Sequence, residues 1–207
     1  MSMILGLYTV SDKTREKILA DPPLVWLLIA PDDPQAYLEE VKPKPKPGFL
    51  KRLFGPRPAP DPIPDESMIP ELDLQPGEGD STDLDKSWHG IYYLLTGVSG
   101  EAQPPLNFLQ EGGRELPGIE VGYGPPRLFS SREVKTILQA LSQIDENILR
   151  SRFDPKDMKK KAIYPDIWDR DPEKDDALGY CLGYFEELKT FLEKCATQNL
   201  GLIITLE

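Results

Sequence analysis

The chain has 207 residues, of which 39% are hydrophobic, and it carries a formal net charge of −11 at pH 7. This length and composition suffice for one folded domain, and the charge argues against a nucleic-acid-binding protein, whose binding face is strongly basic. No stretch approaches the roughly 20 apolar residues of a membrane span, and the first residues lack a secretion signal. We therefore expect a cytoplasmic protein without stable membrane association.

The first 41 residues predict one strand followed by three short helices. Residues 3–10 are apolar and end in β-branched side chains, which favours a buried strand. Ser11 is placed to cap the first helix, and Asp33-Pro34 to start the third. An apolar run between prolines favours the second. We expect these helices over residues 12–20, 24–30 and 33–40.

A proline-rich stretch follows, and we interpret residues 42–82 as an insertion within a single domain that spans 1–207. Alternating Lys and Pro at 42–47 exclude helix and central strand, because proline removes a backbone donor and restricts its predecessor. Residues 42–60 hold six basic side chains and no acidic one, whereas 61–83 hold eight acidic and no basic one. The insertion is therefore segregated by charge.

A short basic amphipathic segment lies inside this insertion, at residues 48–55. Four apolar side chains share one face of a helical turn, and two basic residues lie between them. The segment could dock on another protein or a membrane surface, although it is too short for stable membrane binding alone. The more usual outcome is that it packs on its own domain. The candidate docking arm consists of Phe49, Leu50, Lys51, Arg52, Leu53 and Phe54.

Residues 84–96 predict a helix that carries the single histidine, His89. Asp83 suits its N-cap and Gly97 its C-terminal end. Gly90, inside the helix, costs roughly 1 kcal/mol relative to alanine, which suggests a close approach or a packing contact at that point. The buried stripe is expected to contain Leu84, Trp88, Ile91 and Leu95, with Asp85, His89 and Tyr92 on the adjoining face.

The second half of the chain alternates short extended pieces with helices. Residues 119–123 and 127–129 read as extended, and Ser130 with Glu133 forms a capping-box signature that opens a helix. Further helices are expected over 145–153, 156–161 and 173–198, and residues 202–206 read as a strand buried on both faces. The pattern predicts a mixed α/β fold with a small central sheet of about four strands flanked by helices.

Metal-dependent and nucleophilic chemistry find little support in the residues. A zinc site needs three or four ligands, and the chain has one histidine and two cysteines, Cys181 and Cys195. Both cysteines fall on the same predicted helix, about 21 Å apart, too far to form a disulfide. No phosphate-binding glycine loop or serine-nucleophile motif occurs. We therefore assign no metal and no cofactor.

One group of polar and aromatic residues remains as a candidate site, because its members lie near the ends of predicted strands. Gathered together, they could bind a small anionic or planar ligand, with His89 as acid or base. Alternatively they form a structural network, in which Asp85 orients His89, Arg127 ties a loop by its carbonyls, and the tryptophans belong to the core. The set comprises Asp85, Lys86, Trp88, His89, Tyr123, Arg127, Tyr164 and Trp168.

Several ordered motifs resemble the signature of the YfbM-like family, a group of bacterial domains of unknown function. The resemblance implies a compact α/β domain with helices around a central sheet, and no particular function. Many members carry a second histidine where this chain has Tyr92, which further weakens a metal site. The motifs are Asp85-Lys-Ser-Trp-His-Gly90 with Leu94-Leu-Thr-Gly97, Tyr123-Gly-Pro-Pro-Arg127 with Glu133-Val134, Phe153-Asp-Pro155 with Met158, and Tyr164-Pro165 with Trp168.

Two functional hypotheses follow. The first is a non-enzymatic binding or protein-interaction module, which fits the acidic surface, the missing catalytic motifs and the basic arm. The alternative is a small-molecule enzyme or ligand sensor with a polar cleft around His89. That alternative requires the side chains of His89, Asp85 and Arg127 to converge around an open pocket.

Overall fold

A computed structural model describes residues 2–42, 65–171 and 173–207. Its centre is a sheet of five strands in the order β2-β1-β5-β4-β3, with every pairing antiparallel. The two central strands come from the two ends of the chain and pair along their full length, from Leu5 opposite Leu206 to Val10 opposite Gly201. The strands are β1 (Leu5–Val10), β2 (Ser81–Asp83), β3 (Arg114–Glu115), β4 (Arg127–Phe129) and β5 (Gly201–Leu206).

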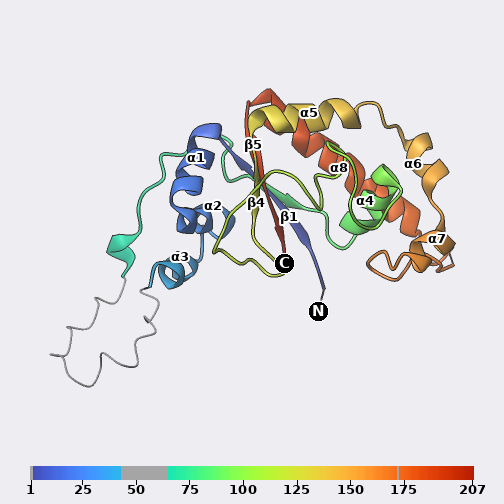
Figure 1. Ribbon diagram of the computed structural model, residues 1–207, viewed down its shortest axis with the longest axis horizontal. Helices are drawn as coiled ribbons and strands as arrows, with labels where there is room; N and C mark the ends of the chain where they lie inside the picture. The colour runs from blue at the N-terminus through green and yellow to red at the C-terminus, as the bar shows by residue number, and fades with distance from the viewer. Residues whose placement is uncertain (1, 43–64, 172) are drawn as a thin grey trace, which may run out of the picture.

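Helices cover both faces of the sheet, which gives three layers (Figure 1). The N-terminal helices α1 (Asp12–Ala20), η1 (Pro22–Val25), α2 (Trp26–Ile29) and α3 (Pro34–Val41) form one outer layer. The other contains α4 (Trp88–Thr96), α5 (Ser131–Leu141), α6 (Glu146–Arg152), α7 (Pro155–Lys160) and α8 (Ala177–Thr197).

Alternating side chains of β5 separate the core into two clusters. Leu202 and Ile204 pack into the larger cluster beneath α4, α5 and α8, whereas Ile203 packs into the smaller one beneath α1 to α3. Successive strand residues point to opposite faces, so a strand buried on both sides must be apolar throughout. The predicted mixed α/β fold and its doubly covered last strand are confirmed. The expected strand number, about four, is corrected to five among the described residues.

Helix caps explain why several helices start where the sequence predicts. Ser11 Oγ accepts a hydrogen bond from Thr14 N–H at 3.1 Å, and Asp33 accepts one from Gln35 N–H at 3.1 Å. Ser130 and Glu133 form the predicted capping box. Each cap satisfies backbone donors that the first helical turn leaves free.

The helix that carries His89 begins later than predicted. α4 starts at Trp88, because Asp83 ends β2 and residues 84–87 form a turn with Asp85 at φ 42°. The Asp83 carboxylate accepts a hydrogen bond from Asp85 N–H at 2.8 Å instead of capping the helix. At the other end, Gly97 adopts the predicted left-handed conformation.

Two further boundaries are corrected. Residues 119–123 do not form a strand: Val121 and Gly122 take part in isolated bridges, and the chain turns there because Gly122 and Gly124 have φ of 59° and 153°. The last helix begins at Ala177 rather than 173, where Asp176 caps it by accepting from Gly179 N–H at 2.8 Å.

The last part of the predicted insertion packs against β1. Beyond a short helix, η2 (Glu66–Met68), Glu78 accepts a hydrogen bond from Ser11 N–H at 2.7 Å and Gly79 N–H donates to Thr9 at 3.0 Å. These bonds lead the chain into β2, so the insertion's final residues belong to the sheet. The candidate docking arm lies outside the described residues: Phe49, Leu50, Lys51, Arg52, Leu53 and Phe54. No helix in the described ranges is long and apolar enough to cross a membrane.

Gly90 is required by close packing between α4, α8 and the loop before α8. A Cβ atom at this position would overlap the Trp168 ring and lie 2.8 Å from Cys181 Sγ. Trp168 is fully buried and donates its indole N–H to Ile163 at 2.7 Å, so it cannot move aside without losing that bond. Gly90 therefore sets the distance at which these segments pack.

We expect Gly90→Ala to lower the free energy of unfolding by about 2 kcal/mol, because overpacking a filled core displaces its neighbours. The matched control is Gly183→Ala on exposed α8 surface, where a Cβ meets nothing within 4 Å. That variant should gain about 0.5–1 kcal/mol from helix propensity. Urea unfolding measures both, and equal effects would contradict the packing explanation.

Candidate functional site

His89 bridges two loops through its imidazole ring. Nδ1 accepts a hydrogen bond from Tyr164 N–H at 3.0 Å, and Nε2 lies 3.1 Å from the carbonyl oxygen of Ser99. Since a carbonyl can only accept, Nε2 must carry the proton, and the neutral ring has one defined tautomer. Burial lowers the pKa of His89 and outweighs the opposing effect of the Ser99 bond. Both ring nitrogens are therefore occupied by the protein's own main chain.

Trp88 and Tyr164 extend this bridge to the start of β1. The Trp88 ring stacks on His89 with centroids 4.9 Å apart, and its indole N–H donates to Met3 O at 3.2 Å. Tyr164 Oη in turn accepts from Met3 N–H at 3.0 Å. Trp168 lies deeper, against Gly90. These four members of the predicted set thus lie together around α4.

Asp85 does not orient His89. Its carboxylate accepts a hydrogen bond from Tyr180 Oη at 2.8 Å, and the same phenol accepts from Lys86 N–H at 3.0 Å. Burial, followed by the bond to Asp85, raises the pKa of Tyr180. Asp85 and the main chain of Lys86 therefore anchor the 84–87 turn to α8, and the expected Asp85–His89 contact is replaced by Asp85–Tyr180.

Arg127 ties a loop to β4 through carbonyl oxygens. Its guanidinium donates to Phe108 at 2.8 Å, Glu111 at 2.6 Å and Leu109 at 2.7 Å. Burial lowers the pKa of Arg127 to about 10, against the opposing charges of Glu115 and Glu111. A fourth carbonyl, that of Gly112, lies at 3.3 Å, so one guanidinium provides donors for four backbone acceptors.

Tyr123 alone of the set is exposed, at 47% of its surface. It borders a hollow of about 290 Å³ that Trp88 and Arg127 also line. Gln110 and Glu115 line the same hollow, and sequence reasoning missed both of them. The position of Glu115 depends on the pairing of β3 with β4, which places it opposite Arg127. A two-residue strand has no periodicity to detect, so no sequence signal could have revealed Glu115.

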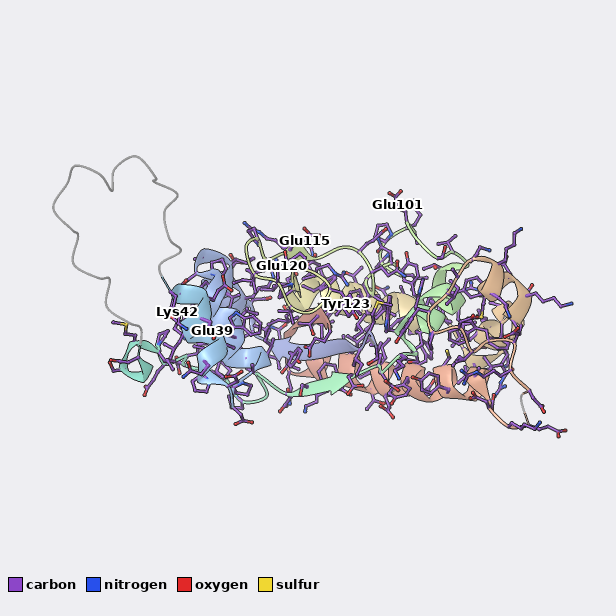
Figure 2. The ribbon with its side chains drawn as sticks, turned by 90° about the horizontal axis from the view of Figure 1, so that it is seen from below. Glu39, Lys42, Glu101, Glu115, Glu120 and Tyr123 are labelled. Atoms are coloured by element: carbon purple, nitrogen blue, oxygen red, sulfur yellow. The ribbon has the colours of Figure 1, made fainter. Side chains whose placement is uncertain are left out.

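Figure 2 shows Tyr123, Glu115 and Glu120 on the same stretch of loops, with Glu101 further along. The predicted set is therefore distributed over three places: the His89 bridge, the Asp85–Tyr180 anchor, and the hollow that Tyr123 and Arg127 border. His89, Asp85 and Arg127 each bind different partners.

Metal and thiol chemistry can be considered for the described residues only. In the ranges 2–42, 65–171 and 173–207, no three His, Cys, Asp or Glu side chains group in a way that could hold a metal ion. Cys181 and Cys195 are both buried and unpaired on α8. Burial raises the pKa of each thiol to about 12. Both thiols stay protonated near neutral pH, and a thiol is a far weaker nucleophile than a thiolate.

The His89 bridge predicts a pH-dependent stability. In the unfolded chain the imidazole has its ordinary pKa near 6.5, whereas the folded pKa is lower. The unfolded state therefore binds the proton first, and stability falls as pH drops below about 6.5 until the folded pKa is passed. His89→Gln keeps one donor and one acceptor but does not titrate. The melting-temperature difference between wild type and variant should narrow from about pH 8 to pH 5; parallel curves would contradict this.

Loss of the Arg127 contacts should destabilise the protein. We expect Arg127→Met to lower the free energy of unfolding by about 2–3 kcal/mol, because it leaves buried carbonyl acceptors without a hydrogen-bond donor. Arg127→Lys should recover only part of this, since an ammonium cannot reproduce the planar guanidinium. Arg132→Lys, on the exposed face of α5, is the control and should change the free energy of unfolding by less than about 0.5 kcal/mol. Urea unfolding of all three variants tests this, and an Arg127→Met variant as stable as wild type would refute it.

Comparisons with known proteins place the chain in a family. No curated protein matches it. Among solved structures, it is similar to the crystal structure of a protein of unknown function, YfbM from Escherichia coli, with a TM-score of 0.61 and 15% sequence identity over 99% of each chain. That likeness shows the fold. A model of the family described as domain of unknown function DUF1877 matches residues 1–205. The chain therefore belongs to the DUF1877 family, and the predicted resemblance to the YfbM-like family is confirmed.

Proposed function

We propose that this protein is a non-enzymatic binding domain whose partner is another protein. The contact region is the Tyr123 surface, which we define as the 121–124 turn together with Gln110 and Glu115. Partner binding at this surface needs no metal, cofactor or activated nucleophile.

A rigidly presented aromatic side chain carries the proposal. Val121 N–H donates to Gly124 O at 2.9 Å, and Tyr123 N–H donates to Leu206 O at 2.7 Å, so the turn is fixed to the end of β5. A Cβ at Gly122 would lie 2.5 Å from the backbone of Glu207, which shows how closely the turn packs there. A large ring held in water by a rigid turn loses little entropy on binding, and such tyrosines are frequent anchors of interfaces.

The engagement of the remaining polar groups supports binding over catalysis. General acid–base catalysis by His89 would need one of its ring nitrogens within reach of a substrate proton, and both nitrogens bond to main chain. The Arg127 guanidinium similarly serves internal carbonyls. These groups stabilise loops, and within the predicted polar and aromatic set Tyr123 is the exposed side chain that remains to face a partner.

A small-molecule ligand sensor is the second candidate, and the hollow beside Tyr123 favours it. Its volume of about 290 Å³ is at the lower end of the ~300–1,000 Å³ typical of ligand pockets. His89 is not among the residues that line it. A sensor would therefore use Trp88, Tyr123 and Arg127 rather than a histidine-centred cleft.

We also propose a cytoplasmic location. Two unpaired, buried cysteines suit a compartment that keeps thiols reduced. The net charge of −11 supports a protein partner over nucleic acid.

Site-specific photocrosslinking in the native host tests the protein-binding proposal. A photoreactive phenylalanine analogue at Tyr123 should give a discrete adduct, whereas the same analogue at exposed Glu187 on α8 should not. The adduct identified by mass spectrometry is then purified as a separate protein. Its affinity should fall at least about tenfold with Tyr123→Ser, the loss typical of a central aromatic anchor.

Two results would overturn the proposal: no adduct at Tyr123, or a purified candidate that binds the Tyr123→Ser variant as tightly as wild type. Thermal-shift screening of wild type and Tyr123→Ser against metabolites addresses the second candidate. Stabilisation by a metabolite in the first protein but not in the second, without any protein adduct, would favour the ligand sensor.

A further inference from the structure

We infer that the Tyr123 surface receives an arginine or lysine side chain of a basic protein partner. This inference rests on the proposed binding function and specifies the chemistry of the partner. Three features of the hollow specify this occupant: its aromatic walls, its exposed carboxylate and the sign of the surrounding charge.

The walls of the hollow suit the stem and head of a long cationic side chain. Trp88, Leu109 and Ile204 are buried and form apolar surface, against which methylene groups can pack. Tyr123 adds an exposed aromatic ring at the mouth. A cation within about 6 Å of an aromatic face is attracted by the ring quadrupole.

Glu115 provides the matching carboxylate. It is exposed on β3 at the edge of the hollow, and no hydrogen bond or ion pair to its side chain is found among the described residues. By contrast, the other carboxylates near α4, such as Asp85 and Asp157, are engaged by Tyr180 and by Tyr93 with Lys161. Glu115 therefore remains available to a partner's guanidinium or ammonium, with which it can form a charge-assisted hydrogen bond.

Arg127 does not make the hollow a site for anions. Its guanidinium donates to three carbonyl oxygens of the 108–111 segment, and the charges of Glu115 and Glu111 act on it. An incoming carboxylate would have to compete with these bonds and approach Glu115. The Arg127 guanidinium is therefore largely occupied by hydrogen bonds within the protein.

The wider surroundings carry negative charge. Residues 101–127 contain four glutamates and two arginines, and Glu207 lies beside the 121–124 turn, which gives five acidic against two basic side chains, or −3. Glu101, Glu115 and Glu120 are labelled on these loops in Figure 2. Arg114 is exposed and opposes a basic partner locally. A field of this sign attracts basic partners and discriminates against acidic ones.

A direct test uses small probes and the full chain. N-acetyl-arginine amide and N-acetyl-lysine amide are titrated against ¹⁵N-labelled protein, with N-acetyl-glutamine amide and N-acetyl-glutamate amide as neutral and acidic controls. The basic probes should give saturable amide shifts confined to residues around 110, 115 and 122–124, weaker at higher salt because the attraction is screened. The neutral and acidic probes should not.

Variants separate local recognition from general charge. Glu115→Gln should weaken the basic probes about three- to fivefold, and Tyr123→Leu about threefold through loss of the cation–π contact. Glu187→Gln on α8 removes the same charge elsewhere and should leave the affinity unchanged. Arg114→Gln should strengthen it. The inference is overturned if glutamine or glutamate amide shifts the same residues as strongly, or if Glu115→Gln and Glu187→Gln behave alike.

The two proposals fail in different ways. A crosslinked partner whose contacting segment is acidic or apolar would remove the basic-partner inference and leave the binding function intact. Absence of any protein adduct at Tyr123 would remove the binding function, whatever the small probes do. The probe titration and the crosslinking experiment thus give independent readouts.

Discussion

The pairing of the first described strand with the last is the contact on which the rest of the structure depends. β1 and β5 form the middle of the sheet, and each contributes side chains to both core clusters. All other strands are short and attach to this pair: β2 to β1, and β4, with β3, to β5. Because the pair comes from opposite ends of the chain, the helices of both layers lie between its two strands in the sequence. Loops are fixed to this sheet by hydrogen bonds such as the one from Tyr123 N–H to Leu206 O.

The loop that presents Tyr123 illustrates this dependence. Its residues have no strand of their own, and they are held by a hydrogen bond to Leu206 and by contact of Gly122 with the backbone of Glu207. An exposed aromatic ring would contribute little to binding on a mobile loop, because ordering it would cost entropy. Attached to the end of β5, it becomes part of a rigid surface. The proposed interface is therefore a consequence of strand pairing.

The polar residues around α4 form hydrogen bonds within the protein itself. A histidine beside a tryptophan, an aspartate and tyrosines is a common composition for an active site. Here His89 joins Ser99 to Tyr164, Asp85 joins Tyr180, and the indole of Trp88 joins Met3. Long loops between short elements leave many backbone groups without regular partners, and side chains of this kind satisfy them. The motif around His89 thus supplies partners for backbone groups of an irregular fold.

The sequence by itself determined the elements whose physics is local. Capping residues such as Ser11 and Ser130 mark helix starts, the apolar run at 202–206 marks a doubly covered strand, and the ordered motifs mark the family. Tertiary structure decided what depends on partners distant in sequence. The two-residue strand β3 exists because β4 lies beside it. Helix α4 starts later than predicted because Asp83 belongs to β2. Glu115, Tyr123 and Arg127 line one hollow only because the sheet edge brings them together. Local patterns record hydrogen bonds within a few residues, whereas a surface is assembled from segments that only folding brings together.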